Sequence, residues 1–300
     1  MSDTTKSDPL EAASAKGAVA SGVQARLGEA KLSGVASPNR ARFDLARQCR
    51  EELRNWPAVL LRAGLWHLGW RQGDFTVSSR AGVTLRAPNH RLAWSPLVEV
   101  LAGDPYQLRD LSWEDPFAPR AVLDVGAHVG TFTCALAARL PGARFTCVEP
   151  SPSTLPWLRA NLARNGLAGK ATIVPVAVAA ADGEADLWAP EDVSSEASLT
   201  PGTGRKVTVW AMSFASVVAA AGGRVDIVKL DCEGGEYAAV LEASSEAWAT
   251  VEQLFLEYHP VAGNHFEELR VRLSEFGLHL VWQHPDRKPE QGMAYFARGR

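Results

Sequence analysis

Apolar residues recur between residues 119 and 300 in two alternating patterns. Short runs rich in Val, Leu and Ile predict buried strands, and stripes with a spacing of about three or four residues predict helices. The expected strands lie near residues 121–125, 144–149, 171–177, 225–231, 251–257, 278–283 and 293–298. The expected helices lie near residues 130–139, 152–165, 213–221, 235–244 and 264–276. This order predicts an α/β fold, a doubly wound, mostly parallel seven-stranded sheet with an antiparallel last strand.

An additional strand pair is expected within this domain. Glu184–Trp188 and Lys206–Trp210 alternate between apolar and polar residues, as half-buried strands do. The segment 194–204, rich in Ser, Thr and Gly, joins them. We expect it to form a loop over the carboxyl edge of the main sheet.

The residues before 119 divide into two parts. Residues 1–38 are rich in Ala, Ser and Gly and carry few large apolar side chains, which predicts a mostly disordered lead. Residues 39–118 form an extension with helices on either side of Pro57, a hairpin over 75–86 and a helix over 96–102. The tryptophan-rich part of this extension could pack against the domain 119–300, cover the substrate, form a dimer surface or lie on a membrane. Packing is the favoured interpretation.

Composition limits the classes of partner. The chain of 300 residues has a formal net charge of −3, so it lacks the basic excess that nucleic-acid binding requires. No apolar run predicts a transmembrane segment, and residues 1–20 lack the apolar core of a signal peptide. The four cysteines contain no Cys-x-x-Cys pair and suit a reduced, cytoplasmic protein. A homo-oligomer remains possible.

The run Val122–Gly130 carries the strongest chemical signal. A buried strand ends there in a turn that contains Asp124, Gly126, Ala127, His128 and Gly130. Glu149 ends the next strand, 149 − 130 = 19 residues beyond the last glycine of the turn. This separation is close to the roughly 20 residues expected for the acid that binds a ribose. The pattern predicts a pocket for an adenosine-containing cofactor.

The details of the turn favour S-adenosylmethionine over a dinucleotide. Counted from Gly126, the dinucleotide fingerprint requires glycine where His128 and Thr131 stand. Asp124 would repel a pyrophosphate but could receive the ammonium group of S-adenosylmethionine. Alternatively, Asp124 could only cap a helix, Glu149 could be a solvated strand end, and His128 could be a loop residue without a ligand contact.

Further polar residues follow the fourth and fifth strands. Asp231 and Glu233 come after one, Glu257 and His259 after the other, and Glu236 begins the next helix. The carboxyl ends of parallel strands meet at one edge, so these groups could converge on one cleft. His259 is the best candidate for a general base, with Glu257 or Asp231 orienting it. The same groups could hold Mg²⁺, but a metal-free site is favoured.

These motifs together resemble the FkbM-type S-adenosylmethionine-dependent methyltransferases. The resemblance covers roughly residues 80–298, and its most specific element is Asp231-Cys-Glu-Gly-Gly-Glu236. It implies a Rossmann-like fold and, in most members, O-methylation of sugars or natural-product scaffolds. It also implies that Asp124, Gly126, Gly130 and Glu149 bind the cofactor, that the strand end at Val176 and Ala177 and the turn at Asp182 border the adenine, and that Asp231 and Glu233 face the methyl-transfer cleft. His128 stands where many relatives have Asn.

Three functions stay open at this point. The first is an O-methyltransferase that acts on a small molecule such as a sugar or natural product. The second is N-methylation of a peptide or amine, which has little need for a base. The third is a non-catalytic adenosine-binding scaffold.

Overall fold

The computed structural model describes residues 38–70, 72–111, 118–189, 197–199, 205–286 and 290–299. The chain divides into a unit of residues 44–299 and a second unit of residues 1–43 with Arg300. The expected disordered lead lies outside the described residues, except for Pro38, where helix α2 (Pro38–Glu52) begins. The unit of residues 44–299 carries both the sheet and the candidate site.

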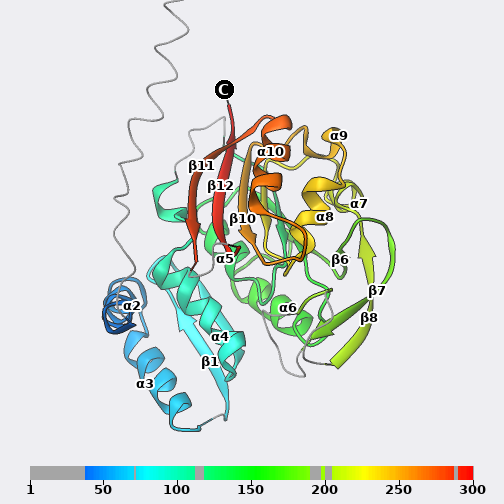
Figure 1. Ribbon diagram of the computed structural model, residues 1–300. Coiled ribbons are helices and arrows are strands. Elements are labelled where there is room, and N and C mark those ends of the chain that lie inside the picture. Colours follow the sequence, from blue (N-terminus) through cyan, green and yellow to red (C-terminus); the bar gives the residue numbers. More distant parts are fainter. Residues whose placement is uncertain are drawn as a thin grey trace, which may run out of the picture. The chain divides into compact units, whose positions relative to one another are not determined.

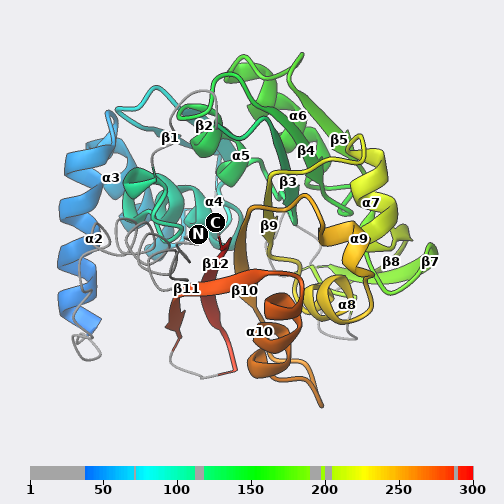
Figure 2. The same ribbon diagram turned by 90° about the horizontal axis from the view of Figure 1, so that it is seen from above.

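Seven strands form the main sheet in the order β11-β12-β10-β9-β3-β4-β5 (Figures 1 and 2). The strands are β3 (Ala121–Val125), β4 (Arg144–Val148), β5 (Ala171–Val174), β9 (Ile227–Leu230), β10 (Gln253–Tyr258), β11 (Leu278–Pro285) and β12 (Gly292–Arg298). β12 is antiparallel to both of its neighbours, and the remaining neighbouring pairs are parallel. The predicted mostly parallel sheet with an antiparallel last strand is confirmed.

Helices cover both faces of this sheet (Figure 2). They are α5 (Thr131–Ala137), α6 (Leu155–Arg164), α7 (Phe214–Ala220), α8 (Gly235–Leu241), α9 (Ser245–Trp248) and α10 (Phe266–Glu275). α5 and α6 contribute to one buried apolar cluster, and α7 to α10 contribute to a second. The helical region that begins at residue 235 divides into α8, which ends at Leu241 within the predicted range 235–244, and α9, which follows the extended residue Ser244 and lies beyond that range.

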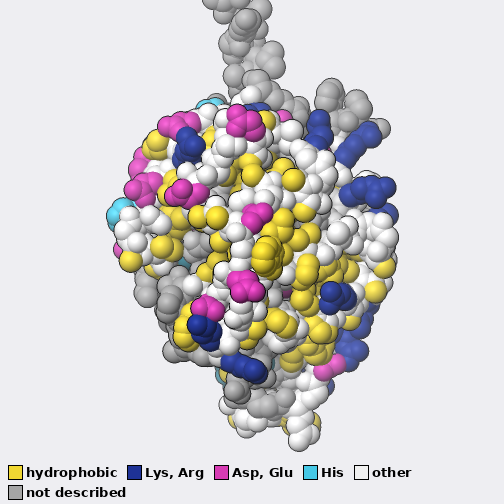
Figure 3. Space-filling view, turned by 90° about the vertical axis from the view of Figure 1, so that its right-hand side faces the viewer, with side chains coloured by type: hydrophobic (Ala, Val, Ile, Leu, Met, Phe, Trp, Pro, Cys, Tyr) yellow, Lys and Arg dark blue, Asp and Glu magenta, His cyan; other side chains and the backbone are white. Residues whose placement is uncertain are grey.

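The strand predicted over 171–177 also divides. β5 ends at Val174, and Ala177–Val178 forms β6 in a separate sheet with β8 (Arg205–Met212) and β7 (Gly183–Ala189). Pro175 lies at the break, where a missing N–H cannot continue the ladder. The expected pair 184–188 and 206–210 is confirmed as β7 and β8. Figure 3 shows the side of the molecule on which Figure 1 places these strands, with apolar side chains gathered among scattered charges.

The extension contains more helix than the sequence predicted. Its elements after α2 are α3 (Trp56–His67), the hairpin β1 (Asp74–Ser78) and β2 (Thr84–Pro88), α4 (Arg91–Val98), the π-helix η1 (Glu99–Gly103) and the 3₁₀ helix η2 (Leu108–Asp110). The predicted hairpin is confirmed. The helix predicted over 96–102 begins five residues earlier, at Arg91, and continues through Pro96 as α4 and η1.

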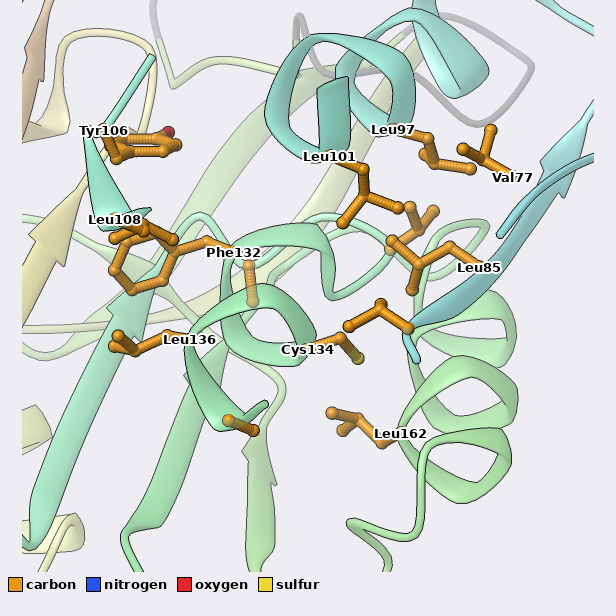
Figure 4. Packing of buried hydrophobic residues seen from close by; sticks show 14 of the residues in the cluster. Val77, Leu85, Leu97, Leu101, Tyr106, Leu108, Phe132, Cys134, Leu136 and Leu162 are labelled. Atoms are coloured by element: carbon orange, nitrogen blue, oxygen red, sulfur yellow. The ribbon is translucent and has the colours of Figure 1, made fainter. Parts of the chain in front are cut away.

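Apolar side chains of the extension join the cluster that covers one face of the main sheet. Figure 4 shows Val77, Leu85, Leu97 and Leu101 approaching residues of α5 and α6. Val59 on α3 is also buried in this cluster. The extension therefore packs against this face, Leu68 beyond α3 is 84% exposed, and the role of the extension as a lid or a dimer surface stays a prediction. Among the described residues, no helix is both long and apolar enough to cross a membrane.

Candidate active site

Two cavities lie at the carboxyl edge of the parallel strands, and they share four lining residues. The shared residues are Gly126 and His128 after β3, and Asp231 and Glu233 after β9. The first cavity is also lined by Glu149 and by Val176 to Val178. The second cavity has a volume of about 450 Å³ and is also lined by Glu257. The two loops therefore form the junction between a cavity beside β4 and a cavity beside β10.

Gly126 allows the loops after β3 and β9 to meet. Its φ is +73°, and a Cβ atom there would lie 1.7 Å from the carbonyl oxygen of Asp231. The N–H groups of Gly126 and Ala127 both donate to the carbonyl oxygen of Val148 at 3.0 Å, which ties the turn to β4. Only glycine, without a Cβ, fits this close approach. The turn predicted from the glycine pattern is present.

Asp124 lies in β3, one residue before its end, and it lines neither of the two cavities. Its side chain is fully buried, and Thr133 donates a hydrogen bond of 2.6 Å to it. Lys229, its neighbour in the β3–β9 register, places Nζ 3.4 Å from Asp124 Oδ1 and 3.1 Å from Asp231 Oδ2. The ammonium group that Asp124 receives in this structure is thus that of Lys229. The prediction that Asp124 receives a ligand's ammonium directly would require Lys229 to move.

Glu149 immediately follows β4 and lines the first cavity. Its side chain is buried, and it accepts hydrogen bonds from the N–H groups of His128 at 2.8 Å and Ser151 at 2.9 Å. Burial raises the pKa of Glu149 to about 7, although these two hydrogen bonds act in the opposite direction. The predicted ribose-binding acid therefore lies at a cavity, and its charge changes near neutral pH.

Apolar residues form the rest of the first cavity. Val176, Ala177 and Val178 line it together with Leu187 on β7 and Leu199. Such a slot suits a flat, weakly polar ring such as adenine. Asp182 does not line it. Its carboxylate accepts hydrogen bonds from the Ser213 N–H and the Ser216 hydroxyl at the start of α7, so a role beside adenine is not what this geometry shows. Of the predicted loop 194–204, only residues 197–199 are described.

The four predicted catalytic residues come together at the ends of β9 and β10; they are Asp231, Glu233, Glu257 and His259. His259 Nε2 lies 3.7 Å from Glu233 Oε2 and 3.9 Å from Glu257 Oε1. The residue that orients the imidazole is Glu236, whose Oε1 lies 2.8 Å from His259 Nδ1 and accepts the backbone N–H of His259 at 2.8 Å. The expected orienting residues, Glu257 and Asp231, do not make this contact. Glu236 does more than complement the N-terminus of its helix.

The crowding of carboxylates changes two pKa values. The negative charge of Asp231, together with burial, raises the pKa of Glu257 to about 8. Burial opposes the charged form of His259, but the hydrogen bond and charge of Glu236, with the charges of Glu233 and Asp231, raise its pKa to about 10. His259 is therefore mainly an imidazolium near neutral pH, and Glu257 is the group whose pKa better suits a proton acceptor.

The same cluster contains three groups that can bind a cation. Asp231, Glu257 and His259 each offer one ligand atom, and these atoms lie within 4.8 Å of one another. Two oxygens and one nitrogen fit Mg²⁺ only in part, because this ion prefers oxygen ligands. Lys229 already supplies a positive charge 3.1 Å from Asp231. A metal-free site stays a prediction.

Several residues that the sequence did not single out complete the site. Lys229 donates hydrogen bonds to the carbonyl oxygens of Gly126 at 2.7 Å and Val125 at 3.3 Å. Burying a lysine inside an apolar parallel strand is costly unless its charge is paired. The position of Lys229 in such a strand could therefore have identified it as a site residue. Tyr106 and η1 bring the extension to the wall of the second cavity, beside Phe132. No motif in the sequence indicated that contact.

Comparison with known proteins identifies the family. A family model described as the methyltransferase FkbM domain matches residues 124–280, more than half of the 300-residue chain. The 31-O-demethyl-FK506 methyltransferase FkbM of Streptomyces tacrolimicus is 24% identical over 172 residues, which cover 47% of this chain and 66% of that protein. The chain thus spans just under two thirds of the length of this relative.

Solved structures with a similar fold include other methyltransferases. Methyltransferase FkbM from Methylobacillus flagellatus KT is 16% identical, with a TM-score of 0.44 over 69% of this chain and 56% of that one. TYW2 of M. jannaschii, solved in complex with AdoMet, is 14% identical, with a TM-score of 0.43 over 77% of this chain and 89% of that one. The match over residues 124–280 shows that the chain belongs to the FkbM family of methyltransferases.

Proposed function

We propose that this protein transfers the methyl group of S-adenosylmethionine to a hydroxyl group of a small molecule, such as a sugar or a natural-product scaffold. The observation that carries the proposal is the pair of cavities that share Gly126, His128, Asp231 and Glu233. A donor in the first cavity and an acceptor in the second would meet at this junction. The scaffold alternative has no need for the second, acidic cavity.

The residues present fit the donor. Glu149 offers a carboxylate to ribose hydroxyls, and the apolar slot at Val176 to Val178 offers a surface to adenine. Asp231 and Glu233 supply negative charge at the junction of the cavities, where a sulfonium is attracted. When bound, S-adenosylmethionine supplies an electrophilic methyl group on that sulfonium.

The chain's own groups would position the acceptor and remove its proton. An alcohol does not ionise by itself near neutral pH, so methylation of oxygen needs a base in reach of the hydroxyl. Glu257 lines the second cavity and is the first candidate. His259, held by Glu236 and close to Glu257, would stabilise the ionised carboxylate as an imidazolium. His259 as the base itself stays a second possibility.

N-methylation of an amine is the second candidate function, and one observation favours it. The second cavity is lined by the carboxylates of Glu99, Asp231, Glu233, Glu257 and Asp286. This charge attracts a cationic amine and repels anionic acceptors.

The two functions respond differently to loss of the base. We expect Glu257→Gln to reduce turnover of an alcohol acceptor by about 100-fold or more, with a much smaller effect on an amine acceptor that is uncharged at the pH of the assay. Acceptors are found by searching extracts for products that gain one methylene in mass. The matched control is Glu184→Gln, which changes an exposed carboxylate on β7. Failure of the wild type to bind S-adenosylmethionine in equilibrium dialysis would sink the proposal as a whole.

Donor binding is expected to depend on pH through Glu149. The ionised carboxylate accepts ribose hydroxyls, and its pKa in the free protein is raised to about 7. Affinity for S-adenosylhomocysteine should therefore increase with pH and level off above about 7, falling up to about tenfold per unit below it. Calorimetric titration at a series of pH values measures this. Glu149→Gln should weaken binding and remove the dependence, and a wild-type affinity that is constant with pH would contradict this role.

A cytoplasmic location is also part of this proposal. The four cysteines are all free thiols, which suits the expected cytoplasmic location. A homo-oligomer stays a prediction.

A further inference from the structure

Tyr106 is a residue of the extension whose side chain reaches the wall of the second cavity. The side chain is 4% exposed, and its ring meets the ring of Phe132 edge-on, with 5.0 Å between the ring centres (Figure 4). A second edge-on contact, at 6.1 Å, joins it to Phe255 on β10. A buried tyrosine hydroxyl usually has a hydrogen-bond partner. Within the part of the chain that the structure describes, the Tyr106 hydroxyl has none, so it is available to a ligand in the cavity.

The neighbours of Tyr106 place it close to the candidate base. Phe255 and Glu257 are two residues apart on β10, so their side chains leave the same face of the sheet, about 7 Å apart. Lys229 lies beside Phe255 in the register of β9 and β10, on that same face. Glu257 and Lys229 also line the second cavity. Tyr106 therefore packs on the row of side chains next to Glu257.

The backbone on both sides of Tyr106 has an unusual conformation. Asp104 and Gln107 each have φ of +52°, in the left-handed region that is uncommon outside glycine. The carboxylate of Asp104 stabilises this loop, because it accepts the backbone N–H groups of Leu108 at 2.8 Å and Arg109 at 2.9 Å. Backbone strain of this kind clusters at sites that bind ligands. The loop thus fixes the position of Tyr106 at the cavity.

We propose that the hydroxyl group of Tyr106 binds the methyl acceptor by donating a hydrogen bond to one of the acceptor's oxygen atoms. The inference rests on the proposed function and names a residue of the extension that recognises the acceptor. Five carboxylates line the second cavity, and an ionised carboxylate only accepts hydrogen bonds. They can accept the hydrogens of a hydroxylated molecule, and Tyr106 can donate to its lone pairs. An ammonium group has no lone pair, so this contact favours a hydroxylated acceptor over a cationic amine.

The protonation of Tyr106 suits a donor. Burial raises the pKa of the Tyr106 hydroxyl well above its ordinary value. The charges of Asp231 and Glu257 act in the same direction, and the charge of Lys229 opposes them. The phenol is therefore uncharged near neutral pH and keeps its hydrogen. The ammonium group of Lys229 is already bound, because it donates to the Gly126 carbonyl oxygen at 2.7 Å and lies 3.1 Å from Asp231 Oδ2.

The test removes only the hydroxyl. Tyr106→Phe keeps the ring that packs against Phe132 and Phe255, so the variant should fold normally. The probe is the extract fraction from which the wild-type protein forms a methylated product, supplied as a dilution series with S-adenosylmethionine that is tritiated in its methyl group. We expect the rate at limiting amounts of this fraction to fall about tenfold, which corresponds to the loss of one hydrogen bond. The affinity for S-adenosylhomocysteine, measured by calorimetry, should stay unchanged.

Tyr295→Phe is the matched control. Tyr295 stacks on Phe255 with 4.9 Å between the ring centres, and it lines neither of the two cavities. Its loss of a hydroxyl should change neither the rate nor the affinity for S-adenosylhomocysteine.

Three results would overturn the inference alone. They are a Tyr106→Phe protein that methylates the fraction as fast as the wild type, an equal decrease of the rate in Tyr295→Phe, and a loss of affinity for S-adenosylhomocysteine in Tyr106→Phe as large as the loss of rate. The last result would show that Tyr106 supports the donor site instead. A wild-type protein that binds no S-adenosylmethionine, or that methylates nothing in any extract, would overturn the proposed function together with the inference.

Discussion

Replacing Gly126 with alanine is expected to remove measurable binding of S-adenosylhomocysteine and to destabilise the fold by about 3 kcal/mol or more. The added Cβ would lie 1.7 Å from the carbonyl oxygen and 2.8 Å from the carbonyl carbon of Asp231. Both are backbone atoms of the loop after β9, so no flexible side chain can turn away. The φ of +73° adds strain for any residue with a Cβ.

Relief of this clash requires the loops after β3 and β9 to separate. That separation would widen the junction of the two cavities and move Asp231 relative to the glycine turn. Calorimetry measures the loss of binding, and urea unfolding measures the loss of stability. Gly169→Ala is the control, because a Cβ there meets nothing within 4 Å and its φ is not positive. A Gly126→Ala protein with normal affinity would show that the loops do not meet as described.

The sequence predicted those parts of the site that depend on local pattern. Gly126 and Glu149 follow strands whose apolar runs are clear, and both line the first cavity as expected. The break at Pro175 was the main error in the sheet, since a run of apolar residues conceals the loss of one N–H. Local pattern thus predicted the order of the strands along the chain and the sheet edge at which ligands bind.

Long-range pairing could not be predicted in the same way. Lys229 lies opposite Asp124 only because β3 and β9 pair in one particular register, and a sequence does not specify the register of parallel strands. Glu236 reaches His259 because α8 begins beside the end of β10. Tyr106 reaches the cavity wall from the extension through irregular backbone. Each of these contacts requires the folded structure.

Replacing Glu236 with glutamine is expected to lower the free energy of unfolding near neutral pH by about 3–5 kcal/mol. The Glu236 side chain is fully buried, and its two oxygens accept the N–H groups of His259 and Gly234. A glutamine would turn an NH₂ group toward one of these donors and leave the His259 imidazolium without its carboxylate. The control is Glu275→Gln, an exposed carboxylate paired with Arg272 on α10, which should cost at most about 1 kcal/mol.

The pH dependence of the free energy of unfolding measures the contribution of the His259–Glu236 pair. The folded state raises the pKa of His259 from 6.5 to about 10. The stabilisation is fully present below about pH 6.5 and is lost as the pH rises toward 10, because the unfolded state then releases the proton first. Glu257, with its pKa raised to about 8, contributes a change in the same direction. Urea unfolding at a series of pH values should therefore show a smaller decrease in Glu236→Gln than in the wild type.

The same variant distinguishes the two candidates for the proton acceptor. The rate with an alcohol acceptor should rise with pH as the base loses its proton. If Glu257 is the base, Glu236→Gln removes the charge that keeps His259 protonated, Glu257 loses a neighbouring cation, and the rise moves to higher pH. If His259 is the base, its own pKa falls and the rise moves to lower pH. We expect the shift to higher pH, and a shift in the other direction would assign the proton transfer to His259.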